Sequence, residues 1–191
     1  MSGELHKHFE VIYNQNKRDI FLYLRHMVRN EESAQDIMQE TFIAFLNRYK
    51  THPLPKTDLD CRKLLFRIAR NLSINHNKLF HNRNILYQAD MEQEGSYNPS
   101  ITQGSGDNSL HKLVLDERTK YVKEILSLME ERYRTALLLR YIHELNLEEI
   151  GEVMDLSVSG VSRLMEKAKR HFTDQAQKLN IEPTLLFEQN E

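Results

Sequence analysis

Residues 147–168 have the side chains that a DNA-reading pair of helices requires. Gly151 is a small residue where two helices can cross closely, and Asp155 tolerates the left-handed backbone of a tight turn. Ser157 follows as a cap for a second helix. The second helix of such a helix-turn-helix lies in the major groove. The spacing therefore predicts duplex binding, and the alternative is a helical hairpin whose charges are only solvated.

The outer side of the second helix is polar and becomes basic along its length. Residues 163–170 contain four basic side chains and one acidic one, a net charge of +3 in a chain whose net charge is −2. A local excess of this kind is typical of phosphate contact. The side chains expected to face DNA are Ser157, Ser159, Ser162, Arg163, Glu166, Lys167, Lys169 and Arg170.

A second basic segment lies nearer the N-terminus. Residues 56–83 hold seven basic side chains and two acidic ones, a net charge of +5. Several of them share the helical face opposite the apolar one, and such a stripe can follow a nucleic-acid backbone and hold unstacked bases. An ordinary solvated helix surface is the alternative. The candidate residues are Lys56, Arg62, Lys63, Arg67, Arg70 and Asn71.

Asp36, Gln39 and Glu40 form a different patch, on the polar side of a predicted helix. Because the patch is acidic and rich in amide groups, it does not suit DNA. A basic protein surface would suit it, and plain solvent is the alternative.

Composition and motif content exclude several other functions. Cys61 is the single cysteine, and no arrangement of histidine, cysteine or acidic residues has the spacing of a metal site or of a catalytic nucleophile and base. No glycine-rich nucleotide loop is present. The sequence thus predicts no enzyme, no metal, no cofactor and no small-molecule substrate. Without a signal peptide or a long apolar run, the expected location is the cytoplasm, with no direct membrane insertion.

The elements that must position these residues all follow a helical pattern, so the predicted fold class is all-α. Apolar residues recur at helical spacing from 9 to 49 and from 59 to 80, and Asn30 caps the helix after it. Residues 87–112 are rich in glycine, serine and acidic residues without apolar periodicity, as in a flexible polar linker. We expect two small helical domains at 1–86 and 113–178, the linker at 87–112 and a tail at 179–191.

Three motifs in this order resemble the extracytoplasmic-function group of the sigma-70 family, over nearly the whole chain. They are SAQDIMQETF at 33–42, LFRIARNL at 65–72 and LEEIGEVMDL at 147–156. The resemblance implies that 1–86 is sigma region 2 and that 113–178 is sigma region 4 with its helix-turn-helix. It also implies an all-helical transcription initiation factor that binds core RNA polymerase and opens promoter DNA.

The same resemblance assigns partners to the three surfaces. Asp36, Gln39 and Glu40 match the positions that bind the β′ clamp helices of polymerase, and the β flap is a further expected contact. The basic segment around 61–77 matches the part that opens the downstream promoter element, and the helix-turn-helix the part that reads the upstream element. An anti-sigma factor is a possible partner. Leu46 and Leu64 stand where many relatives carry tryptophan, so any aromatic role at these positions is lost.

Several alternatives stay open at this level. The linker either threads the channel of polymerase or is a disordered tether. A stand-alone helix-turn-helix regulator explains only the C-terminal half, and a helical adaptor explains the apolar grooves without the basic faces. Residues 181–191 either dock on a partner, pack on region 4 or fray.

Overall fold

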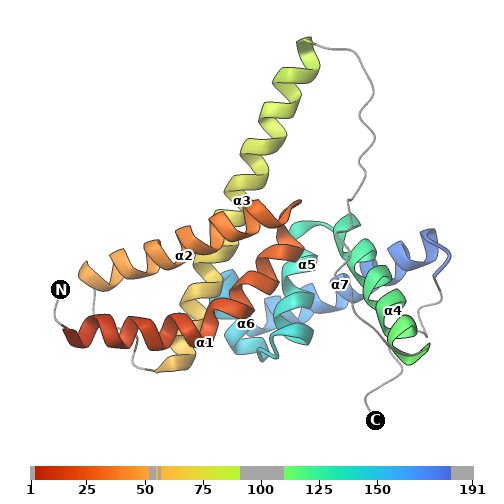
Figure 1. Ribbon diagram of the computed structural model, residues 1–191. Coiled ribbons are helices and arrows are strands. Elements are labelled where there is room, and N and C mark those ends of the chain that lie inside the picture. The colour runs from red at the N-terminus through yellow and green to blue at the C-terminus, as the bar shows by residue number, and fades with distance from the viewer. Residues whose placement is uncertain (1–2, 52–54, 56, 91–109, 182–191) are drawn as a thin grey trace.

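The computed structural model describes residues 3–51, 55, 57–90 and 110–181. Every regular element in these residues is a helix, which confirms the all-α prediction. Short turns join most of them (Figure 1). The helices are α1 (Gly3–Met27), α2 (Glu31–Thr51), α3 (Asp58–Asp90), α4 (Leu110–Leu128), α5 (Glu131–Leu137), the π-helical segment η1 (Leu138–Ile142), α6 (Leu147–Met154) and α7 (Val158–Lys178).

Side-chain caps fix where α2 and α3 begin. The Asn30 side chain accepts a hydrogen bond from the backbone N–H of Ser33 at 2.7 Å, and the Thr57 hydroxyl accepts one from Asp60 at 3.1 Å. Each cap satisfies a donor that the first turn of a helix leaves open. The predicted cap at Asn30 is present, and α1, α2 and α3 pack against one another around buried side chains that include Ile20, Leu24, Phe45, Leu65 and Phe66.

Helix α3 is longer than the sequence predicted. We expected a helix over 59–80 and a linker over 87–112, whereas α3 continues to Asp90 and α4 already begins at Leu110. The reason is local: after the helix start, the first glycine is Gly95, so no glycine or proline interrupts α3. The last turns of α3 project beyond the other helices in Figure 1. Residues 91–109 of the predicted linker lie outside the described part of the chain.

The segment η1, which continues α5, has the wider hydrogen-bonding pattern of a π-helix. The backbone N–H of His143 bonds to the carbonyl of Leu138 at 3.1 Å, five residues back, and that of Leu145 bonds to Leu139 at 2.9 Å. Glu144 then takes a positive φ of 58°. This wide turn places the His143 side chain at 2% exposure inside the protein.

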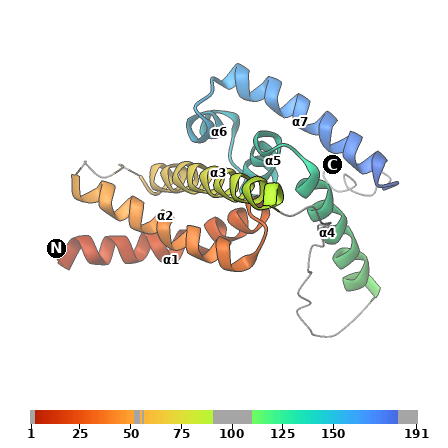
Figure 2. The same ribbon diagram turned by 90° about the horizontal axis from the view of Figure 1, so that it is seen from above.

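Helix α3 lies between the α1–α2 pair and the α6–α7 pair (Figure 2). Buried apolar side chains from both halves of the chain belong to one continuous core, and its members from the C-terminal half include Ile125, Leu139, Ile150 and Val161. The sequence indicated two domains but gave no sign that they pack directly against each other.

Candidate nucleic-acid interface

The turn between α6 and α7 has the geometry predicted for a helix-turn-helix. Asn146 and Glu149 form a reciprocal capping box at the start of α6. Asp155 adopts the left-handed conformation, with φ 60° and ψ 49°, and the backbone N–H of Leu156 bonds to the Gly151 carbonyl at 2.9 Å. The prediction for Asp155 is therefore confirmed, while the capping box was a sequence signal that we missed.

Gly151 is required by the close approach of the turn. A Cβ atom at this position would lie 2.6 Å from the carbonyl oxygen of Leu156, and 3.7 Å from the Val161 side chain of α7. Other contacts hold both groups in place, because Val161 is fully buried and the backbone N–H of Leu156 is hydrogen-bonded to the Gly151 carbonyl. The predicted role of Gly151 as the small contact residue is confirmed. Because Gly151 has no side chain, α7 can pack closely on α6.

The cap of α7 leaves the outer side of that helix open. The Ser157 hydroxyl accepts a hydrogen bond from the backbone N–H of Gly160 at 3.1 Å, as its predicted role as a cap requires. The Arg163 side chain donates a hydrogen bond to the Ser159 carbonyl at 3.3 Å, so this side chain lies along the helix. All eight predicted DNA-facing residues are exposed on this side: Ser157, Ser159, Ser162, Arg163, Glu166, Lys167, Lys169 and Arg170.

The basic face of α3 is only partly open. Arg67 and Asn71 are exposed, Arg70 is half-buried, and Lys56 lies outside the described residues. Lys63, by contrast, is only 12% exposed because α6 lies over it. The prediction of one continuous solvent-facing stripe is therefore wrong at Lys63, since the packing of α6 on α3 could not be read from the sequence.

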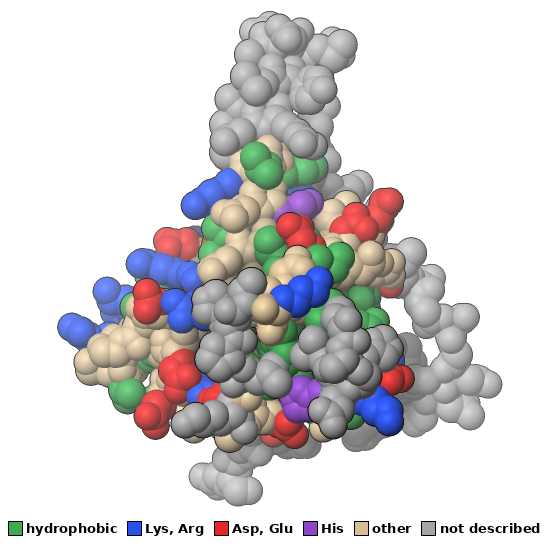
Figure 3. Space-filling view, turned by 90° about the vertical axis from the view of Figure 1, so that its left-hand side faces the viewer, with side chains coloured by type: hydrophobic (Ala, Val, Ile, Leu, Met, Phe, Trp, Pro, Cys, Tyr) green, Lys and Arg blue, Asp and Glu red, His purple; other side chains and the backbone are tan. Residues whose placement is uncertain are grey.

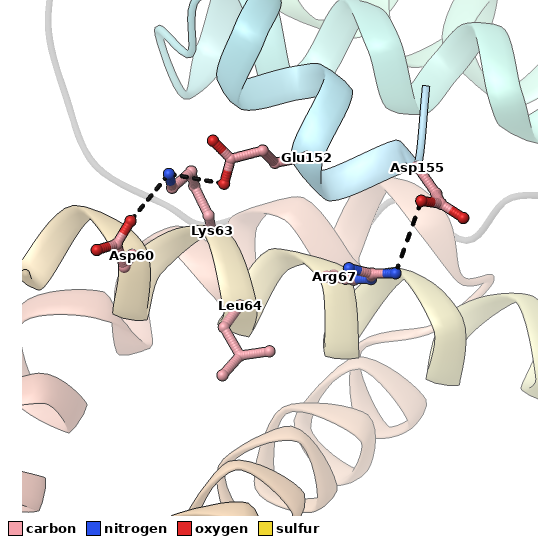
Figure 4. Close-up of a pocket in the computed structure, with 6 residues that line it drawn as sticks. All are labelled: Asp60, Lys63, Leu64, Arg67, Glu152 and Asp155. Carbon is pink, nitrogen blue, oxygen red and sulfur yellow. Dashed lines mark ion pairs between the residues drawn. The ribbon is translucent and has the colours of Figure 1, made fainter. Parts of the chain in front are cut away.

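Acidic side chains of α6 engage this face (Figure 4). The Lys63 ammonium lies 2.7 Å from the Glu152 carboxylate and 3.0 Å from that of Asp60, and the carboxylates hold the pKa of Lys63 above its usual value. Arg67 approaches Asp155 more loosely, at 3.9 Å. Together with Leu64, these residues line a shallow pocket between α3 and α6.

Arg62 turns towards the C-terminal helices. Its guanidinium pairs with Asp19 of α1 at 2.8 Å and donates to the backbone carbonyl of His143 at 3.0 Å. This predicted nucleic-acid contact therefore joins α1, α3 and the turn after η1. Its charge is neutralised locally by Asp19.

Asp36, Gln39 and Glu40 are all exposed on α2, as the sequence predicted. One turn further along lies Ile43, which is 58% exposed although it is a large apolar residue. The sequence analysis did not single out Ile43. An apolar side chain beside an acidic-amide patch suits a protein partner, because it adds buried area to polar recognition.

The charges elsewhere on the surface are mixed. Figure 3 shows basic and acidic side chains interspersed over the face that it displays, without a continuous basic field. Among the described residues, no group of three or more His, Cys, Asp and Glu side chains could hold a metal ion. No helix in the described ranges is long and apolar enough to cross a membrane.

His143 is buried where the two halves of the chain meet, which the sequence did not indicate. Its ring packs against Phe66 and Tyr23, with centroids 4.7 and 6.1 Å apart. Burial lowers the pKa of His143 to about 4, although the nearby Asp19 carboxylate opposes the shift. The Arg62 and His26 charges add to the lowering. His143 is therefore neutral in the folded chain at neutral pH.

Acid should weaken the folded state through His143. The pKa of His143 is lower in the folded chain than in the unfolded one. Its contribution to the free energy of unfolding is therefore complete above about pH 6.5 and decreases as the pH falls towards 4. We expect the free energy of unfolding to fall by about 2 kcal/mol from this group between pH 7 and pH 5. Urea titrations of the wild type and His143→Gln measure this, with the exposed His8→Gln as the control. An equal pH dependence in all three chains would contradict the assignment.

Comparison with known proteins identifies both halves of the chain. Residues 12–78 match the family model described as "Sigma-70 region 2", and residues 119–172 match "Sigma-70, region 4". Two Bacillus subtilis relatives are the ECF RNA polymerase sigma factors SigW and SigM. SigW is 29% identical over 90% of this chain and 90% of its own length, and SigM is 25% identical over 83% and 89%.

A solved structure has a similar fold. The sigma factor RpoE from Bartonella quintana, crystallised with the anti-sigma factor NepR, aligns with a TM-score of 0.64. The alignment covers 90% of this chain and 98% of that one, at 13% sequence identity.

Proposed function

The chain belongs to the extracytoplasmic-function group of the sigma-70 family and is an RNA polymerase sigma factor, and we propose that three of its surfaces each have one role in transcription initiation. One surface binds core polymerase, one reads the upstream promoter element as duplex, and one binds the opened downstream element. Like its family, the chain is a non-enzymatic subunit, so binding energy alone drives each step.

The outer side of α7 reads the upstream element. The observation that carries this assignment is the capped, tightly locked α6–α7 pair, whose outer side remains exposed and becomes basic beyond Arg163. A preformed helix of this kind enters the major groove without further ordering. Arg163 contacts base edges, while Lys167, Lys169 and Arg170 add phosphate contacts.

The basic face of α3 binds the opened downstream element. Unstacking a base costs a few kcal/mol, and stacking on protein returns about 1–3 kcal/mol per base, so the balance is close. Arg67, Arg70 and Asn71 on this face supply charge and hydrogen-bond donors to the single strand. Contacts from polymerase would supply the remaining free energy.

The acidic-amide patch on α2 binds core polymerase. Asp36, Gln39 and Glu40 are exposed on one face, with Ile43 beside them to add apolar contact. A basic helical surface on the partner complements this patch, and the β′ clamp helices and the β flap are the partner elements that the family resemblance implies. Helices α2 and α7 lie on opposite sides of α3 in Figure 2, so a partner on α2 leaves α7 free for DNA.

An anti-sigma factor is a further partner in this proposal. The similar RpoE chain from Bartonella quintana was crystallised with the anti-sigma factor NepR, and the likeness to that chain covers both halves of this one. We expect a protein of this class to hold the chain inactive until a signal releases it.

Arg163→Ala tests the duplex-reading surface. We expect duplex promoter affinity to fall at least tenfold, because a good base-edge contact contributes about 1–3 kcal/mol of discrimination. Fluorescence anisotropy with a labelled duplex measures this, and co-purification with core polymerase should not change. Lys178→Ala, at the exposed end of the same helix, is the matched control and should bind as the wild type. Equal losses of duplex and polymerase binding would contradict the assignment.

A further inference from the structure

The first turn of α7 presents a valine among the side chains that are expected to face DNA. Val158 is the first residue of α7 and is 51% exposed, and the sequence analysis did not single it out. Val161, three positions further on, is fully buried in the core, whereas the Val158 side chain is exposed to solvent. Val158 therefore contributes little apolar burial to the fold, and its methyl groups are available to a bound partner.

The serines on either side of Val158 already make hydrogen bonds within the chain. The Ser157 hydroxyl accepts a bond from the backbone N–H of Gly160 at 3.1 Å, and it is hydrogen-bonded to the Ser159 hydroxyl at 3.2 Å. Residues 158–162 contain no charged side chain. The first turn of α7 thus offers a base the apolar methyl groups of Val158, and not the ionic contact that a basic residue makes with guanine.

The position of Val158 on α7 suits contact with a base edge. In a helix-turn-helix, residues at the start of the second helix reach the base edges in the major groove. Val158 lies one turn before Ser162, so the two side chains share a side of the helix, and both are exposed. Because valine is branched at Cβ, it has one strongly preferred rotamer in a helix. Val158 therefore has little side-chain freedom to lose when it binds.

The C5 methyl of thymine is the one apolar group that a base pair presents in the major groove. The other groups on the base edges there are hydrogen-bond donors and acceptors. A valine methyl placed against such a donor or acceptor would exclude water from it without supplying a hydrogen bond, which is unfavourable. An apolar side chain at this place on α7 consequently favours a base pair that turns a thymine methyl towards it.

We propose that Val158 selects a thymine in the upstream promoter element, through contact between its methyl groups and the thymine C5 methyl. This inference rests on the proposed duplex-reading role of α7. Arg163 lies five residues further along the helix, which is about 7.5 Å and so about two base-pair steps. Since arginine most often reads guanine, the element should contain a thymine about two or three base pairs from a guanine.

Replacement of single thymines by deoxyuridine tests this contact, because deoxyuridine lacks only the C5 methyl. Holoenzyme made from core polymerase and the wild-type chain is used to select duplexes from a random library, and each thymine of the upstream element is then replaced in turn. We expect one replacement to lower the affinity of the wild-type holoenzyme about fourfold, which corresponds to the burial of one methyl group. With Val158→Ala, the same replacement should have no effect.

Val11→Ala is the matched control, because Val11 is also 51% exposed and lies on α1, in the other half of the chain. It should retain the fourfold effect of the deoxyuridine replacement. Both alanine variants should bind core polymerase as the wild type does, and circular dichroism should show unchanged helical content. Since no charge is altered, Val158→Ala should also keep the wild-type salt dependence of duplex affinity.

Three results would overturn the proposal. The first is a thymine effect of equal size in the wild type and in Val158→Ala, and the second is no thymine effect in the wild type. The third is weaker polymerase binding by Val158→Ala with the thymine effect retained, which would assign Val158 to a protein interface. In each case, a selected duplex sequence that Arg163→Ala no longer discriminates would show that α7 still reads duplex and that only the role of Val158 had failed.

Discussion

Gly151→Ala should lower the free energy of unfolding by about 2 kcal/mol, although alanine is the better helix former. The added Cβ would lie 2.6 Å from the backbone carbonyl of Leu156, so the turn of the helix-turn-helix must shift. The shift would move α7 away from α6 and disturb the core position of Val161. Urea denaturation measures the stability, and anisotropy with duplex DNA should show a parallel loss of promoter affinity.

Gly160→Ala is the matched control for this substitution. A Cβ atom at position 160 would lie 3.2 Å from the Ser157 hydroxyl, which can adjust by a few tenths of an ångström, and 3.7 Å from the Leu156 Cβ, an ordinary contact distance. Because alanine also favours the first turn of α7, we expect stability within about 0.5 kcal/mol of the wild type. If both alanine variants were equally stable, the close approach at Gly151 would not be what fixes the turn.

Asp36→Lys combined with Glu40→Lys should reduce affinity for core polymerase about 100-fold or more, while the helical content stays unchanged. The two residues are exposed on α2, so the substitutions leave the core intact. They replace attraction to a basic partner surface with repulsion, which costs several kcal/mol when like charges meet in an interface. Titration of labelled chain with core polymerase measures the affinity.

The control for this pair carries the same change in net charge elsewhere. Glu10 on α1 and Asp174 on α7 are exposed as well, and Glu10→Lys with Asp174→Lys should bind polymerase within a few-fold of the wild type. A large loss in both double variants would indicate a response to net charge alone. Full binding by the Asp36 and Glu40 variant would rule out the patch on α2 as the polymerase contact.

The parts of the fold that the sequence predicted are those that depend on neighbouring residues. The helix-turn-helix follows from Gly151, Asp155 and Ser157 within seven positions, and the structure has each in its expected conformation. Exposure of Asp36 and Glu40 likewise follows from the periodicity of a single helix. Short-range rules of helix geometry and capping are sufficient for these features.

Local sequence patterns could not predict the contacts between distant segments. Tyr23 meets Thr135 across 112 positions, and Lys63 meets Glu152 across 89, so no local pattern reports them. The burial of His143 depends on the wide π-helical turn that precedes it, which has no clear signature in the sequence. For this reason the basic stripe on α3 was expected to be open, whereas α6 covers it at Lys63.

The functional assignment needed the order of three motifs as well as their individual chemistry. The helix-turn-helix alone indicates only that the chain binds DNA. The motif at 33–42 and the basic helix that follows it indicate a sigma factor, and the two family matches at 12–78 and 119–172 agree with that order. The packing of α6 on α3 brings distant segments together, and no single motif indicates that contact.

The most direct test of the central assignment is transcript mapping with purified core polymerase and a library of bacterial promoters. Start sites that appear only when the wild-type chain is added, and that disappear with Asp36→Lys and Glu40→Lys, are the expected result. If the wild-type chain yields no new start sites and does not co-purify with core polymerase, the chain does not act as a sigma factor.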